Sequence, residues 1–240
     1  MKPIAVIVRK ELHSYFNSAV AYIVVTLFLA LTSVWFFAVH QFAARDFASL
    51  RGYFAVMPFL FVVLLPAISM RSWAEEHTSG TAELLLTMPF SELQLVVGKF
   101  LAALLLVIIM LALTLTVPLT VLPLGRFETG EIVGQYVGTL LLASVGISLG
   151  QFVSSLSRNQ ISAFLISALV LLLITLLHVA TAVADLPRGA AAVINHLSLL
   201  YHYHGFERGL IDSRAVVYYL LLSSGFLYLN AKTLLLRKWS

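Results

Sequence analysis

The chain has 240 residues, of which 60% are hydrophobic and only 11% are charged, and its mean hydropathy is +0.98. A soluble domain carries about 25% charged residues, so this composition excludes a soluble fold and predicts an integral membrane protein. The absence of cysteine excludes disulfides and thiolate metal sites. We attribute the net charge of +4 to basic residues at the ends of membrane spans, where they face anionic lipid headgroups, and not to nucleic-acid binding.

Residues 1–17 predict an amphipathic helix at the membrane interface. Ile4, Val8 and Leu12 recur at helical spacing, whereas Arg9 and Lys10 fall largely on the other side. A helix with one apolar face and one basic face lies in the plane of the interface. An ordinary extension of the first span is the alternative.

Six apolar segments then predict six membrane-spanning helices, because each is long enough for the roughly 30 Å hydrocarbon core of a bilayer. They cover residues 19–39, 53–70, 91–122, 132–156, 160–184 and 215–236. The expected fold is therefore an all-α integral membrane protein with a single domain over residues 1–240. Its elements are an interfacial helix at 1–17, a helical segment at 71–90 between spans two and three, and a polar external segment at 185–214.

The distribution of basic residues predicts the orientation of these spans. Nine of them lie on the side of the two termini and six on the other side. Basic residues favour the cytoplasmic side of a membrane. We therefore expect a multi-pass protein of the bacterial cytoplasmic (inner) membrane with both termini, and the segment 71–90, in the cytoplasm.

Four glycines share one ridge of the fourth span at multiples of four residues. They are Gly134, Gly138, Gly146 and Gly150. Small residues in this arrangement allow two helix backbones to approach closely. We expect them to serve helix packing within one subunit, and a subunit interface is the alternative.

The chain lacks the groups that would let it drive transport by itself. Its spans hold no carboxylates of the kind that ion-coupled carriers place near the midplane. Its nearest approach to a nucleotide-binding loop is Gly98-Lys99, but Leu93 replaces the required glycine and Phe100 the required Ser or Thr. We therefore expect no catalytic residue and no cofactor in this chain, and we expect Lys99 to anchor span three at the headgroups.

Two alternative chemistries can be stated for the polar residues. Histidines and acids in the segment 185–214 could form a metal site; they are His196, His202, His204, Glu207 and Asp212. Polar contacts at the membrane surface are the favoured interpretation, with no metal bound. Glu75 and Glu76 could form a catalytic pair, but neighbouring helix residues diverge by about 100°, which disfavours a membrane enzyme.

The segment 71–90 has its own pattern of helix and breaks. Residues 72–77 favour a short helix that Thr78-Ser79-Gly80 interrupts, residues 81–87 can form a second turn that Met88-Pro89 ends, and Ser91 with Gln94 forms a capping box for span three. We expect a rigid helical element at the membrane surface that carries Glu75, Glu76 and Glu83 outward and moves with spans two and three. A solvated loop is the alternative.

Two stretches resemble a known family. The stretch RSWAEEHTSGTAELLLTMP, residues 71–89, resembles the coupling segment of type-2 ABC exporter permeases, whose pattern is roughly R-x-x-A/S-E-E-x-x-x-G-T-x-E-x-L-L-x-x-P. The matching residues include Arg71, Glu75, Glu76, Gly80, Thr81, Glu83 and Pro89. The stretch from residue 202 to 218 is similar to the segment before the last span in the gliding-motility (GldF-like) permease subgroup, and the matches there include His202, Arg208, Asp212 and Arg214.

This resemblance implies a permease subunit of an ATP-driven ABC transporter. Its implied partners are cytoplasmic P-loop ATPase subunits, which bind the ATP and Mg, a second permease copy or a related permease chain, an accessory subunit and membrane lipids. The segment 71–90 would be the coupling helix that docks on the ATPase, and the segment 185–214 would form short external helices. The alternative function is a non-transporting membrane anchor or assembly factor that recruits a soluble partner.

Overall fold

The computed structural model describes residues 3–40, 49–81, 90–124, 128–183 and 187–238, and within these ranges the chain is helical and contains no strand. The helices are α1 (Pro3–Phe16), α2 (Ala19–Val34), the π-helical turn η1 (Trp35–Val39), α3 (Arg51–Phe54), α4 (Met57–Ser69), α5 (Arg71–Thr78), α7 (Glu92–Thr114), α8 (Thr116–Val121), the 3₁₀ turn η3 (Leu122–Leu124), α9 (Thr129–Leu156), α10 (Gln160–Val183), α11 (Arg188–Leu197), α12 (Leu199–Glu207) and α13 (Ser213–Lys238).

Six segments of the described chain are long and apolar enough to span a membrane, which confirms the predicted all-α membrane fold. They are Ala19–Val39, Arg51–Thr78, Glu92–Val121, Thr129–Leu156, Gln160–Thr181 and Ser213–Leu236. The second segment is longer than the sequence predicts, because Met70 keeps helical backbone angles and leads α4 directly into α5. The first half of the segment 71–90 is therefore a continuation of span two.

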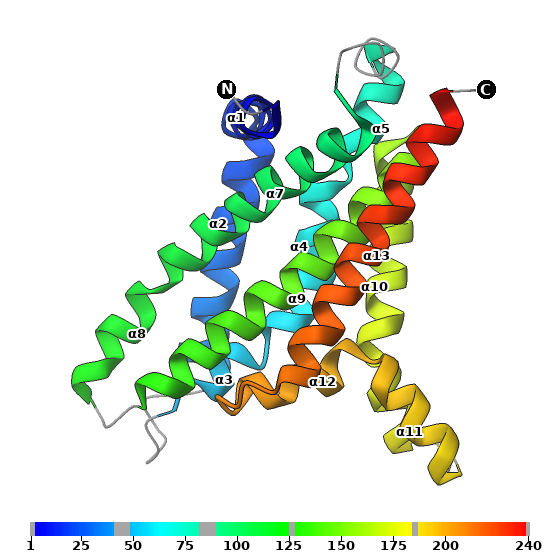
Figure 1. Cartoon of the computed structure of the whole chain (residues 1–240). Helices are drawn as coiled ribbons and strands as arrows, with labels where there is room; N and C mark the ends of the chain where they lie inside the picture. The colour runs from blue at the N-terminus through cyan, green and yellow to red at the C-terminus, as the bar shows by residue number, and fades with distance from the viewer. Residues whose placement is uncertain (1–2, 41–48, 82–89, 125–127, 184–186, 239–240) are drawn as a thin grey trace.

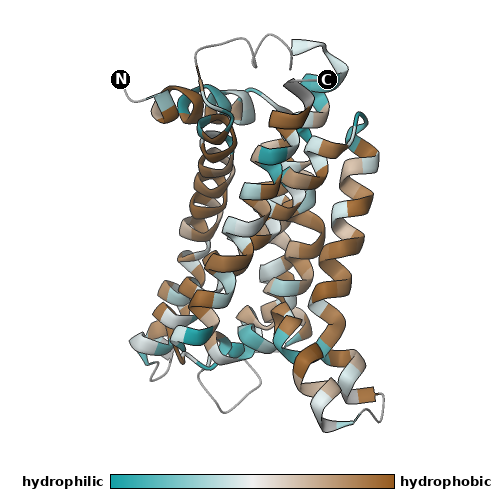
Figure 2. Ribbon diagram, turned by 45° about the vertical axis from the view of Figure 1, so that its right-hand side comes forward, coloured by the Kyte–Doolittle hydropathy of each residue, from teal (hydrophilic) through white to brown (hydrophobic). Residues whose placement is uncertain are grey.

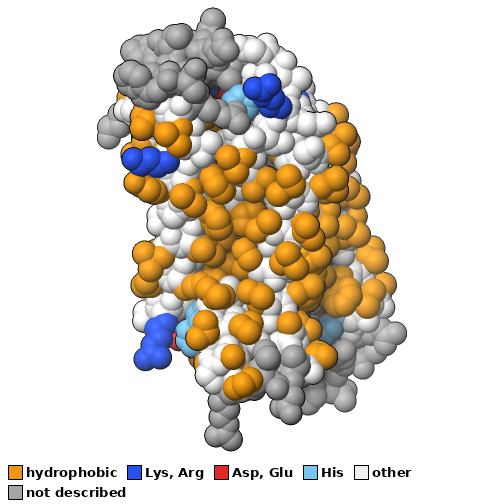
Figure 3. All heavy atoms as spheres, turned by 90° about the vertical axis from the view of Figure 1, so that its right-hand side faces the viewer, with side chains coloured by type: hydrophobic (Ala, Val, Ile, Leu, Met, Phe, Trp, Pro, Cys, Tyr) orange, Lys and Arg blue, Asp and Glu red, His pale blue; other side chains and the backbone are white. Residues whose placement is uncertain are grey.

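The two ends of the bundle carry different elements (Figure 1). At one end lie α1, α5 and the C-terminal end of α13, while α3, α11 and α12 lie at the opposite end. Hydrophobic residues fill the length of the spanning helices between these ends, and hydrophilic residues gather toward the ends (Figure 2). The face seen in Figure 3 has the same distribution, with its charged side chains near the top and the bottom of a broad hydrophobic band.

Helix α9 is the centre of the bundle. It packs against α4, α5, α7, α10, α12 and α13. Within its most apolar stretch 67% of the residues are buried inside the protein, compared with 22% in the corresponding stretches of α10 and α13. Its buried polar side chains bond within the protein; Thr139, for example, pairs with the hydroxyl of Tyr203 on α12 at 2.9 Å. Helix α9 therefore contacts α5 at one end of the bundle and α12 at the other.

The glycine ridge of α9 packs against the same chain. A Cβ at Gly138 would lie 2.2 Å from Cβ of Phe206, one at Gly146 would lie 2.3 Å from Leu65, and one at Gly150 would lie 2.0 Å from the hydroxyl of Ser69. The fourth glycine, Gly134, faces the backbone of Gly209. The ridge thus seats α4 and the end of α12 on α9, and Leu142 fills its middle position with only 3% of its surface exposed.

Candidate coupling site

The junction between α4 and α5 contains a side chain inserted from α9. The hydroxyl of Ser154 donates to the carbonyl of Met70 at 2.7 Å and accepts from the backbone N–H groups of Trp73 and Ala74, each at 3.1 Å. In an unbroken helix the N–H of Ala74 would bond the carbonyl of Met70 directly. An inserted side chain of this kind bends a helix, so Ser154 sets the direction in which α5 leaves span two.

Replacing Ser154 with alanine tests this role. The carbonyl of Met70 and the buried N–H groups of Trp73 and Ala74 lose their shared partner, so we expect the free energy of unfolding to fall by about 1–3 kcal/mol. The measurement is denaturant unfolding of the purified protein in mixed micelles. Ser155→Ala is the matched control, because Ser155 is equally buried but bonds only the carbonyl of Phe152 in its own helix. Equal losses in the two variants would contradict the inserted role of Ser154.

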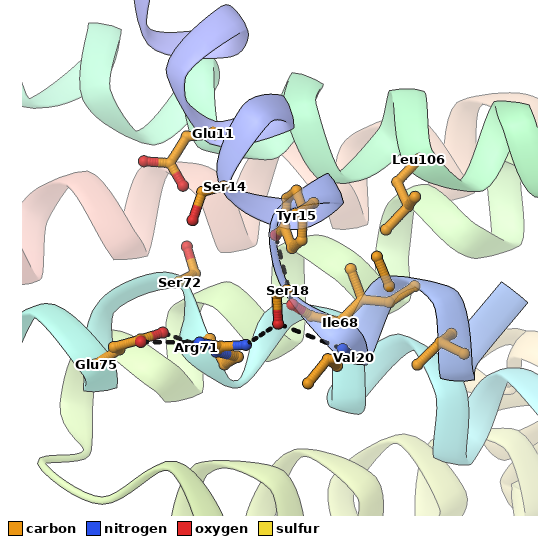
Figure 4. Close-up of a pocket in the computed structure, with 12 residues that line it drawn as sticks. Glu11, Ser14, Tyr15, Ser18, Val20, Ile68, Arg71, Ser72, Glu75 and Leu106 are labelled. Carbon is orange, nitrogen blue, oxygen red and sulfur yellow. Dashed lines mark hydrogen bonds and ion pairs between the residues drawn. The ribbon is translucent and has the colours of Figure 1, made fainter.

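Arg71, at the start of α5, forms a two-pronged ion pair. Its Nε lies 2.7 Å from Oε2 of Glu75 and its Nη2 lies 2.9 Å from Oε1, and its Nη1 donates to the hydroxyl of Ser18. Figure 4 shows the guanidinium between Glu75 and Ser18, with Tyr15 above it. Ser18 also caps α2 by accepting from the N–H of Val20. Arg71 thereby joins the first turn of α5 to the turn between α1 and α2.

Lys99 of α7 lies at the centre of a buried charged cluster. Its Nζ is 2.8 Å from Oε1 of Glu76 and 3.0 Å from Oε1 of Glu11, and its side chain is 3% exposed. The ammonium also lies 4.8 Å from the ring centre of Trp73, and Lys10 flanks both carboxylates from the surface at 3.7 and 3.8 Å. This Lys99 cluster (Glu11, Glu76, Lys99 and Trp73) joins α1, α5 and α7 through one side chain.

Helix α1 packs closely against α7 and reaches α4 through the side chain of Tyr15. A Cβ at Gly98 would lie 2.6 Å from Ile7, so only a glycine at this position lets α1 approach α7 so closely. The hydroxyl of Tyr15 reaches the carbonyl of Ile68 at 3.4 Å, and burial raises the pKa of this phenol. A small pocket of about 40 Å³ remains between Tyr15, Ser18 and Arg71 (Figure 4). It is too confined for more than water, so α1, α2 and α5 are closely packed here and leave no ligand site.

The far end of α5 is exposed. The helix ends where the N–H of Ser79 bonds the carbonyl of Glu75 and Gly80 adopts φ of +70°, the left-handed conformation that glycine provides after a helix. Thr78 bonds the carbonyl of Arg158 on the neighbouring loop at 2.7 Å, and Thr81 is exposed. The expected second turn, with Glu83 and Pro89, lies outside the described residues, and the capping box of Ser91 and Gln94 is present beyond it.

Two expectations about this site are wrong. Glu76 does not point outward, because it is the partner of Lys99 and is 12% exposed. Lys99 does not anchor a helix at the headgroups, because its side chain is buried between two carboxylates. Glu75 stands at the border of the site, 45% exposed and paired with Arg71. The sequence indicated neither Glu11 nor Ser154, and the one signal available was an isolated lysine in an apolar helix, which demands an acidic partner.

The segment before the last span forms α11 and α12 at the opposite end (Figure 1). His202 stacks on Tyr218 with ring centres 4.1 Å apart and bonds the carbonyl of His196, while His204 pairs with Glu207 at 3.0 Å. Within the described residues no three His, Cys, Asp or Glu side chains are placed to hold a metal ion. Arg208, Asp212 and Arg214 are exposed at the end of α12 and the start of α13.

Comparison with family models gives a match over residues 30–207 to the ABC-2 family transporter proteins. The chain belongs to this family. The matched region covers more than half of the chain and includes α5, α9, α11 and α12. A comparison with curated proteins found no match. ABC-2 membership and six spanning segments establish an integral membrane protein of a transporter family.

Proposed function

We propose that this ABC-2 protein is the permease subunit of an ATP-driven ABC transporter and that it receives its energy through α5. Two copies, or this chain and a related permease, would form the translocation path between them. The distribution of basic residues supports a cytoplasmic location for both termini and α5 in a bacterial inner membrane. The motif at residues 202–218 supports a relationship to the GldF-like subgroup.

The observation that carries this proposal is the way α5 is held. Its base continues α4 of span two and is bonded by Ser154 to α9, which is span four. Lys99 joins it to α1 and to α7 of span three. Its tip at Ser79, Gly80 and Thr81 is exposed. A helix fixed at its base to three spans and exposed at its tip passes a push on the tip into the bundle. ATP and Mg would reside in a cytoplasmic P-loop ATPase that docks on the segment 71–90.

Charge reversal beyond the tip tests the docking surface. We expect Glu83→Lys to lower the stimulation of the partner ATPase by at least about tenfold, because removing one partner of a buried interfacial charge pair costs about 2–5 kcal/mol. The assay is ATP hydrolysis by the co-purified complex in liposomes. Glu128→Lys is the matched control, since Glu128 is an exposed carboxylate at the N-terminal end of α9, at the opposite end of the bundle.

The outcomes of this assay also separate the permease from the alternatives. Unchanged stimulation in Glu83→Lys would place the docking surface elsewhere. Transport by the chain alone in liposomes without ATP would overturn the proposal. Binding of an ATPase or another soluble partner without any ATP-dependent transport would favour the membrane anchor.

A further inference from the structure

A pocket of about 480 Å³ lies where α11 and α12 meet the start of α13, at the end of the bundle opposite the termini. Its lining combines charged, aromatic and aliphatic side chains. They include His202, Asp212, Arg214, Val217, Tyr218 and Leu221. No part of the coupling site contributes to it.

The lining changes from polar to apolar along α13. Arg214, Val217 and Leu221 are spaced by three and four residues and so share one face of the helix. At 1.5 Å per residue, Leu221 lies about 10 Å deeper than Arg214. Val217 and Leu221 are 52% and 66% exposed within a segment that can span a membrane. The pocket therefore extends from the membrane surface into the hydrocarbon region.

The mouth of the pocket carries one fixed charge of each sign. Asp212 Oδ1 accepts the backbone N–H of Arg214 at 2.9 Å, which caps α13 and holds the carboxylate beside the helix start. The guanidinium of Arg214 has no hydrogen-bond or ion-pair partner in the part of the chain that the structure describes. Burial lowers the pKa of His202, which favours the neutral form of its imidazole.

The walls of the pocket are held in place by their own bonds. The hydroxyl of Tyr218 donates to the carbonyl of Leu197 at 2.7 Å, which ties α13 to the end of α11. The ring of His202 stacks on Tyr218 and its Nε2 lies 3.1 Å from the carbonyl of His196. A pocket whose walls are already ordered loses little entropy when it is filled.

We propose that this pocket binds one zwitterionic phospholipid with a phosphoethanolamine headgroup, from the leaflet opposite the termini. The ammonium group pairs with the carboxylate of Asp212, the phosphate pairs with Arg214, and an acyl chain lies along Val217 and Leu221. A headgroup without a cation leaves Asp212 facing a phosphate, and a trimethylated ammonium cannot donate the hydrogen bonds that a carboxylate accepts. This lipid site is distinct from the permease function and does not depend on it.

The first test measures which lipid stays on the purified full-length protein. The protein in detergent is mixed with equal amounts of phosphatidylethanolamine, phosphatidylcholine and phosphatidylglycerol, and bound lipid is counted by native mass spectrometry. We expect about a threefold preference for phosphatidylethanolamine, the ratio that one partly exposed ion pair provides. Asp212→Asn should abolish the preference while still capping α13, since asparagine caps a helix as well as aspartate does. Glu128→Gln, at the same end and outside the pocket, should keep it.

The second test fills the apolar part of the pocket. Val217→Trp should lower the retention of all three lipids, and Leu220→Trp should not, because Leu220 is exposed on the same helix but does not line the pocket. Thermal unfolding confirms that each variant is folded. A lipid preference that survives Asp212→Asn, retention that survives Val217→Trp, or a protein dimer that fills the pocket without lipid would each overturn the proposal.

Discussion

Replacing Lys99 with methionine is expected to lower the free energy of unfolding by about 3–5 kcal/mol, the cost of removing one partner from a buried ion pair. The ammonium is 3% exposed and lies within 3.0 Å of two carboxylates. Without it, Glu11 and Glu76 face each other in a poorly solvated space, and only the exposed Lys10, at 3.7 and 3.8 Å, remains to compensate their charge. Because the two carboxylates belong to α1 and α5, we also expect the variant to lose most of its ability to stimulate the ATPase of the proposed complex.

Two further variants distinguish the charge of Lys99 from its size. The triple variant Lys99→Met, Glu11→Gln and Glu76→Gln should recover most of the lost stability, since replacing every member of a buried charged group by neutral ones is often nearly neutral. Lys232→Met should have little effect, because Lys232 is exposed and lies 5.6 Å from the ring centre of Tyr228. Unfolding in mixed micelles gives all the values. A triple variant no more stable than Lys99→Met alone would show that packing, and not charge, is lost.

Rescue of stability need not restore coupling. If the Lys99 cluster transmits motion, the neutral triple variant folds but moves α1 and α5 independently, and its ATPase stimulation stays low. If the cluster only stabilises the fold, stimulation returns together with stability. The two measurements on one variant therefore separate a structural role from a coupling role.

The sequence predicted those helix ends and spans that depend on residues close together in the chain. The spans follow from uncharged runs of sufficient length, the end of α5 follows from Thr78-Ser79-Gly80, and the start of α7 follows from Ser91 and Gln94. Each of these features involves residues at most a few positions apart. The bounds of the spanning segments accordingly lie close to the expected ones, except that span two continues through α5 to Thr78.

The contacts within the candidate coupling site could not be predicted in the same way. Lys99 is 88 residues from Glu11, and Ser154 is more than 80 residues from the carbonyl it bonds. The inward direction of Glu76 depends on the helical phase that α5 takes over from α4, and Ser154 adjusts that phase. A pattern within residues 71–90 cannot show which of two adjacent glutamates faces the bundle. Only the packing of α1, α5, α7 and α9 together decides it.

The contact between α9 and the end of α12 should be the least tolerant of a single methyl group. Gly209 has φ of +76°, and a Cβ there would lie 2.5 Å from the backbone Cα of Glu131. Left-handed backbone costs a non-glycine residue about 1–2 kcal/mol, and overpacking a close contact costs about 1–3 kcal/mol. Gly209→Ala should therefore lower the free energy of unfolding by about 2–5 kcal/mol.

Gly80→Ala separates the two causes, because Gly80 has nearly the same φ of +70° but no heavy atom of the described chain within 4 Å of its added Cβ. It should lose only the backbone term of about 1–2 kcal/mol. The difference between the variants, measured by denaturant unfolding, is then the cost of separating the α12–α13 turn from α9.

Since Gly134 faces the backbone of Gly209 across the same contact, Gly134→Ala should add little once Gly209→Ala has opened it. Full additivity of these two substitutions would mean that the two glycines do not share one contact, and that the end of α12 is not seated on α9 as the structure has it.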